Sequence, residues 1–173
     1  MSLFARLFGS TPDPRERLRP LWQRVVALSR DPAWYADCHV ADTVSGRFDM
    51  ICAVLSLVLL RMEGSDLRRE SAYLAELFVE DMEGQLREFG VNDVVVGKRM
   101  GGLMSALGGR LGSIRTALAA DDLIELTGTI ERNVTFADAG SPLGAAERLL
   151  AMHRELTGAS DAALLAGDFG DTR

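Results

Sequence analysis

The sequence predicts a single all-α domain. Apolar residues recur at helical spacing along nearly the whole chain, and no segment alternates polar and apolar residues over a useful length. A chain of 173 residues buries about 70% of its unfolded surface, so one hydrophobic core can hold it. Its cysteines, Cys38 and Cys52, are too few for a disulfide framework. We expect one compact multi-helix domain of about seven helices, with no second domain and no internal repeat.

The chain is predicted to have three parts. Residues 1–12 form a short amphipathic N-terminal segment in which Leu3, Phe4, Leu7 and Phe8 accompany Arg6. Burying these apolar side chains contributes roughly 6–10 kcal/mol, whereas ordering the segment costs on the order of 8–16 kcal/mol. Residues 13–156 are the predicted helical domain. Residues 157–173 are small and acidic, and we expect them to form a flexible tail.

Two start signals precede the first helices of this domain. Asp13 is the predicted N-cap of the first, with Pro14 at the first helical position and Glu16 completing a capping-box-like pair. The signal recurs at Asp31-Pro32, where it predicts a short helix that carries Trp34 and Tyr35.

The next helices are predicted to build the core. We expect Ser45 to cap a helix through FDMICAVLSLVLLRM, which is apolar nearly all round. Its apolar run of about eleven residues is well short of the ~20 that cross a bilayer. A long helix then follows the break at 64–66 and ends at Gly90, which we expect in the left-handed conformation. Further helices are predicted at 122–133 and 143–156.

A glycine-rich helix lies between Gly90 and residue 122, with Asn92 or Asp93 as its predicted cap. A glycine in a helix interior costs up to ~1 kcal/mol relative to alanine. We therefore expect neighbouring helices to approach this one closely. The pairs Gly101/Ser105 and Gly108/Gly112 favour such packing, with the protein's own core as the expected neighbour and a client's transmembrane helix as the alternative.

The sequence does not support nucleotide or metal chemistry. The string GVNDVVVGKR resembles a phosphate-binding loop, but Asn92 replaces the first Gly of that loop and Arg99 replaces its Ser or Thr. His39 and His153 are the only histidines, and no Glu-x-x-His pair occurs. We therefore predict no catalytic residue, no metal site and no cofactor.

The charge distribution argues against DNA as a partner. The net charge is −6, and residues 1–30 carry six Arg against Asp13 and Glu16, so the rest of the chain is strongly acidic. A global basic field for nucleic acid is absent.

Two charge-dense segments, WYADCHVADTVSGRFD at 34–49 and EDMEGQLREFGVNDVVVGKRM at 80–100, are the predicted functional region. They are rich in Trp, Tyr and Arg, the residue types enriched where partners bind. We expect the two segments to lie together in space. Alternatively, their charged residues only cap helices and pair with one another. The candidate partner-binding residues are Trp34, Tyr35, Asp42, Thr43, Arg47, Phe48, Asp49, Arg87, Glu88, Asp93 and Lys98.

These segments also resemble a known family. Trp34-Tyr35, Asp42-Thr43, Gly46-Arg47-Phe48-Asp49, then LRE and GV-x-D-x-x-VGK, occur in an order similar to that of the ubiquinol–cytochrome c chaperone family. The resemblance covers about 20–133. The chain departs from the family pattern at His39 and Ala41, where Gly and Pro are usual, and at Leu107 and Gly108, where an aromatic residue is usual.

The resemblance implies an assembly chaperone rather than an enzyme. Such a protein binds newly made cytochrome b and promotes assembly of the ubiquinol–cytochrome c reductase complex of the respiratory chain. A second assembly factor, the ribosome and weak peripheral contact with the inner membrane remain open as further partners. We expect a cytoplasmic protein. The alternative function is a haem- or quinone-related all-α enzyme, against which the lack of clustered His or Cys argues.

Overall fold

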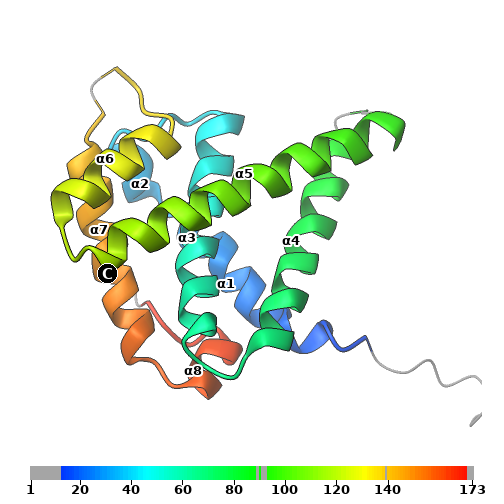
Figure 1. The fold of residues 1–173 in the computed structure, drawn as a ribbon. Helices are drawn as coiled ribbons and strands as arrows, with labels where there is room; N and C mark the ends of the chain where they lie inside the picture. Colours follow the sequence, from blue (N-terminus) through cyan, green and yellow to red (C-terminus); the bar gives the residue numbers. More distant parts are fainter. Residues whose placement is uncertain (1–12, 89, 91–92, 139, 171–173) are drawn as a thin grey trace, which may run out of the picture.

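The computed structural model describes residues 13–88, 90, 93–138 and 140–170. The prediction of a single all-α domain is confirmed (Figure 1). The helices, in chain order, are η2 (Glu16–Leu18), α1 (Arg19–Ser29), α2 (Pro32–Ala36), α3 (Val44–Glu63), α4 (Arg68–Glu88), α5 (Asp93–Ala119), α6 (Leu123–Asn133), α7 (Pro142–Gly158) and α8 (Asp161–Ala166).

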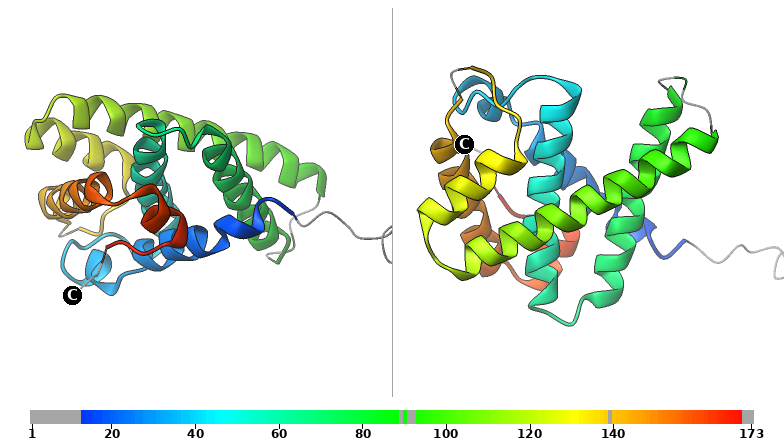
Figure 2. Two further views of the ribbon diagram at one scale, coloured as in Figure 1. Left: turned by 90° about the horizontal axis from the view of Figure 1, so that it is seen from below. Right: turned by 45° about the horizontal axis from the view of Figure 1, so that its top comes forward.

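Helix α3 is the centre of the fold. It packs against α1, α4, α5 and α7, and every residue from 49 to 59 is buried. Its buried Ser56 hydroxyl donates to the carbonyl of Cys52 at 2.7 Å, so no polar group is stranded there. Figure 2 shows α3 and α4 between α5 on one side and α1 with α8 on the other. A helix that is apolar all round therefore has neighbours all round.

Helices α4 and α5 form a long hairpin that turns at Gly90. This residue has φ +75°, the left-handed conformation expected for it. From the turn, α5 runs diagonally across α4 and α3 towards α6 (Figure 1). The hairpin thus brings the C-terminal half of α4 beside the N-terminal end of α3, which is the region that carries the candidate site.

Side-chain caps fix where the helices begin. The Asp31 carboxylate accepts a hydrogen bond from the Ala33 N–H and begins α2 as predicted. Thr43, and not the predicted Ser45, caps α3: its hydroxyl accepts from the Gly46 N–H at 3.2 Å. Thr43 has the extended backbone that an N-cap requires, whereas Ser45 already lies inside the helix.

The glycine-rich helix differs from its prediction. A Cβ built on Gly97, Gly101, Gly102, Gly108, Gly109 or Gly112 would meet no atom within 4 Å. Most of these glycines are exposed, because α5 turns its larger residues Val96, Met100, Leu107 and Ile114 towards the core. The expectation that a neighbouring helix approaches the glycines closely is therefore wrong for the described residues.

The C-terminal region also differs from its prediction. Instead of a flexible tail after residue 156, α7 continues to Gly158 and α8 follows. Leu164 and Phe169 are buried, and the guanidinium of Arg24 donates to the carbonyls of Phe169 and Gly170. The small residues that suggested disorder allow this segment to pack tightly against α1. The predicted amphipathic segment 1–12 lies outside the described residues.

Candidate functional site

An apolar groove opens where α3, α4 and α5 meet. It has a volume of about 370 Å³, within the size range of small binding hollows. We call it the α3–α4 groove. Its lining consists of Arg30, Val44, Ser45, Arg47, Phe48, Ile51, Met82, Gln85, Leu86 and Leu103. The two predicted segments therefore do come together, because residues from 44 to 48 and from 82 to 86 line one hollow.

Arg47 stands at the rim of this groove. Its guanidinium Nε donates to Asp42 at 2.6 Å, and both side chains are more than half exposed. This hydrogen bond lowers the pKa of Asp42 below its usual value. A second hollow of about 540 Å³ shares Arg30 and Arg47 with the groove. It is lined by Arg30, Pro32, Tyr35, Ala36, Asp42 and Arg47. The guanidinium of Arg47 is accordingly accessible from both sides.

Trp34 and Tyr35 anchor α2 to α1. The Trp34 side chain is 1% exposed, and its indole N–H donates to the Leu28 carbonyl at 2.8 Å. Arg148 lies over its ring at 4.6 Å. The Tyr35 hydroxyl donates to the Ser29 carbonyl, and burial raises the pKa of this phenol. Trp34 is among the predicted partner-binding residues, but its indole is buried because it fills the space between α1 and α7.

Asp49 is also buried, although Arg47 two positions earlier is exposed. Its carboxylate accepts from the Arg110 guanidinium, from the Thr135 N–H at 3.0 Å and from the Thr135 hydroxyl at 2.7 Å. Phe48 lies between the Arg110 guanidinium and the Phe78 ring. Asp49 therefore ties α3 to α5 and to the loop after α6, and it offers no free oxygen to a partner.

The remaining candidates do not line the groove. Arg87 is 57% exposed and has its Nη2 3.8 Å from a Glu83 oxygen. Glu88 and Lys98 are exposed, but neither lines the groove. The side chain of Asp93 lies outside the described residues. The structure thus gathers Tyr35, Asp42, Arg47 and Phe48 around the two hollows, with Thr43 capping the helix between them.

Sequence reasoning missed two arginines. Arg110, the partner of Asp49, stands in a Gly-Arg pair that could have signalled a structural role. Arg30, at the C-terminal end of α1, lines both hollows and is exposed. No pattern in the sequence connects Arg30 to the later segments, because only the packing of α1 against α3 brings it there.

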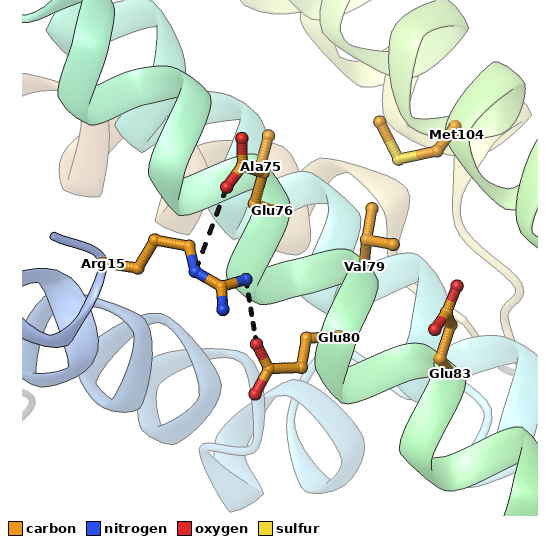
Figure 3. Close-up of a pocket in the computed structure, with 7 residues that line it drawn as sticks. All are labelled: Arg15, Ala75, Glu76, Val79, Glu80, Glu83 and Met104. Atoms are coloured by element: carbon orange, nitrogen blue, oxygen red, sulfur yellow. Dashed lines mark ion pairs between the residues drawn. The ribbon is translucent and has the colours of Figure 1, made fainter. Parts of the chain in front are cut away.

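A third hollow, of about 460 Å³, has the opposite character. It lies between α4 and the start of the domain and contains Glu76, Glu80 and Glu83 (Figure 3). Arg15 reaches across it, with its guanidinium 3.0 Å from Glu80 and 4.0 Å from Glu76. The carboxylates of this hollow thus already have a cation among them, so the hollow is a weaker candidate for a charged partner.

The described part of the chain has neither a metal-binding cluster nor a membrane-spanning helix. No group of three or more His, Cys, Asp or Glu side chains is arranged to hold a metal ion. No described helix is long and apolar enough to cross a membrane.

Comparisons with known proteins identify the family. The crystal structure of the Cbp3 homolog from Brucella abortus has a TM-score of 0.78 and 30% sequence identity, over 98% of this chain and 95% of that one. None of the curated proteins matches the chain. The family described as ubiquinol-cytochrome C chaperone matches residues 36–171, which include α3 to α8 and every lining residue of the α3–α4 groove except Arg30. The chain is a member of the ubiquinol–cytochrome C chaperone family.

Proposed function

We propose that this protein is an assembly chaperone that binds newly made cytochrome b and promotes assembly of the ubiquinol–cytochrome c reductase complex. The family match over residues 36–171 carries the proposal. The α3–α4 groove supports it, since an apolar hollow with a polar rim suits the capture of a protein segment. The protein acts by binding and release, and it is not an enzyme.

A gene deletion tests the proposal directly. Membranes of the deletion strain should lose the b-type haem absorbance of the reductase complex, while other oxidases keep theirs. Restoration by the intact gene is the control. A deletion strain with normal levels of the complex would refute the proposed function.

Arg47 and Arg87 are the predicted contacts that the same strain can test. An exposed ion pair is worth about 0–1 kcal/mol, whereas an Arg that anchors an interface costs about 2 kcal/mol or more when truncated. We expect Arg47→Ala and Arg87→Ala to melt within a few degrees of the parent protein and to fail to restore cytochrome b. Full restoration by both variants would remove these residues from the site but would leave the function intact.

The visible spectrum of the purified protein tests the enzymatic alternative. A haem-related enzyme would retain a Soret band, whereas the chaperone proposal expects none from the purified chain.

A further inference from the structure

We propose that the α3–α4 groove binds an apolar helical segment that carries a carboxylate beside its apolar face, and that Arg30 binds this carboxylate. The inference rests on the proposed chaperone function, because it specifies which kind of client segment the site accepts. It can nevertheless fail separately from that function.

The lining of the α3–α4 groove is positively charged. Arg30 and Arg47 are its only charged residues, and the lining contains no Asp or Glu. The protein as a whole has a net charge of −6. The positive charge at the rim of the groove is therefore opposite in sign to that of the whole protein. Electrostatic complementarity at such a rim selects partners and sets their orientation. The groove therefore favours an anionic group next to apolar side chains.

The guanidinium of Arg30 has its hydrogen-bond donors unpaired within the described structure. No described residue forms an ion pair or a side-chain hydrogen bond with its guanidinium. Arg47, the other cation of the rim, is held by Asp42, and Arg148 of α7 is held by Asp31. A guanidinium presents paired donors that match the two oxygens of a carboxylate. Arg30 is thus the cation of the rim that has its donors available.

The shape of the α3–α4 groove suits a helical occupant. The walls are helices, and the described residues include no sheet edge that an extended peptide could join. Phe48, Ile51, Met82, Leu86 and Leu103 supply most of the apolar lining, which is called the apolar floor here. A groove between helices accepts the apolar face of another helix, whose anchors recur at i, i+3, i+4 and i+7.

A bilayer surface fits less well than a helix. An anionic membrane would be repelled by the exposed Asp42 and by the net negative charge of the protein, whereas a single carboxylate that enters the groove can pair with Arg30. The short apolar floor also matches a few side chains rather than an extended sheet of lipid.

Peptide titration tests the inference. The probes are three fluorescein-labelled amphipathic peptides with Leu at i, i+3, i+4 and i+7, which differ only in having Glu, Gln or Lys beside the apolar face. Fluorescence anisotropy with the full chain should give roughly tenfold tighter binding for the Glu peptide than for the Lys peptide, as charge-assisted hydrogen bonds imply. Arg30→Gln should abolish this preference, and Arg30→Glu should reverse it. Arg68→Gln is the matched control, because Arg68 is an exposed arginine at the opposite end of α4.

Several outcomes would overturn the inference. They are equal binding of the three peptides, no binding of any, or a preference that survives Arg30→Gln. Flotation with vesicles of phosphatidylglycerol and phosphatidylcholine tests the lipid source: if Arg30→Gln loses only vesicle binding, the groove faces lipid and the inference is wrong. Circular dichroism melts within a few degrees of the parent show that the variants fold.

The deletion strain separates this inference from the proposed function. Arg30→Glu should fail to restore cytochrome b, while Arg68→Gln should restore it. If deletion removes the complex and Arg30→Glu restores it fully, the inference fails and the function stands. If deletion leaves the complex intact, the function fails, and the peptide titration still decides what the groove binds.

Discussion

At the scale of single residues, Gly46 holds the loop before α3 against the first turn of that helix. A Cβ at this position would collide with the carbonyl oxygen of Ala41 and stand 3.0 Å from its carbonyl carbon. Because that neighbour is backbone, it cannot move aside as a side chain could. Gly46 is therefore required by space, and its place in the GRFD motif has a structural reason.

We predict that Gly46→Ala lowers the free energy of unfolding by about 3 kcal/mol, at the upper end for overpacking. Urea unfolding followed by circular dichroism measures the change. Gly102→Ala is the control, since a Cβ there meets no atom within 4 Å. Equal midpoints for parent and Gly46→Ala would show that the loop yields.

Truncation of Arg47 and of Asp49 should lower the stability of the protein to very different extents. Asp49→Ala leaves a partly buried Arg110 guanidinium and Thr135 without their acceptor, and breaking such a pair costs about 3–5 kcal/mol. Arg47→Ala removes an exposed pair worth about 0–1 kcal/mol. Thermal melts of the two variants measure this contrast. Similar melting temperatures would contradict the division into a structural and a surface residue.

The sequence could not make this division. It placed Arg47 and Asp49 in one motif, but residues two apart on a helix point in very different directions. The partner that fixes Asp49, Arg110, lies 61 positions further along the chain. The burial of Asp49 therefore depends on how α3 packs against α5, and the local sequence around Asp49 cannot predict it.

At the scale of elements, the exposed glycines make α5 less stable than alanines at the same positions would. We predict that Gly101→Ala with Gly108→Ala raises the free energy of unfolding by about 1–2 kcal/mol, because each alanine favours the helix and meets no neighbour. Urea unfolding checks the sign. A loss of stability would mean that an atom contacts this face after all.

Helix α8 should contribute to the stability of the domain. Leu164 is fully buried against the core, and truncating such a leucine costs about 2–5 kcal/mol. We predict a clearly lower melting temperature for Leu164→Ala and a smaller decrease for the half-buried Leu165→Ala. A flexible tail would make both variants melt like the parent.

The elements differ in how well the sequence revealed them. Helices α1, α4, α5, α6 and α7 have apolar periodicity, α3 is apolar nearly all round, and α2 and α7 begin at recognisable caps. Helix α8 has six residues, too few to be stable alone, and it forms because α1 offers it a surface. The spacing of the glycines in α5 could not reveal which way they face, since small residues suit a tight contact and an open surface equally.

At the scale of the whole molecule, Cys52 reports on the opening of the core. It is fully buried in α3, and burial raises the pKa of its thiol to about 12. The thiolate is the reactive form, so at pH 8 both access and ionisation are suppressed. In a Cys38→Ser variant, we predict that Ellman's reagent reacts with Cys52 of the native protein only as fast as the protein unfolds. In urea that unfolds the protein, the reaction should be fast. A fast stoichiometric reaction of the native variant would show that the core opens locally.

The α3–α4 groove is formed by residues of several helices, so the sequence could predict only part of it. Motif order pointed to the correct family and to Arg47 and Phe48. Arg30 and Leu103 come from helices on opposite sides of α3 and were not predicted, since they join the groove only in the assembled domain.

The contact between α8 and α1 has a consequence for how the protein is made. Arg24 donates to the carbonyl of Phe169, 145 positions later, and Arg61 pairs with Asp161, 100 positions later. During synthesis, α1 emerges from the ribosome long before the residues that cover it, and contacts of such long range form late in folding. The first helix therefore acquires its full packing only after α8 and the residues that follow it to Gly170 have left the ribosome.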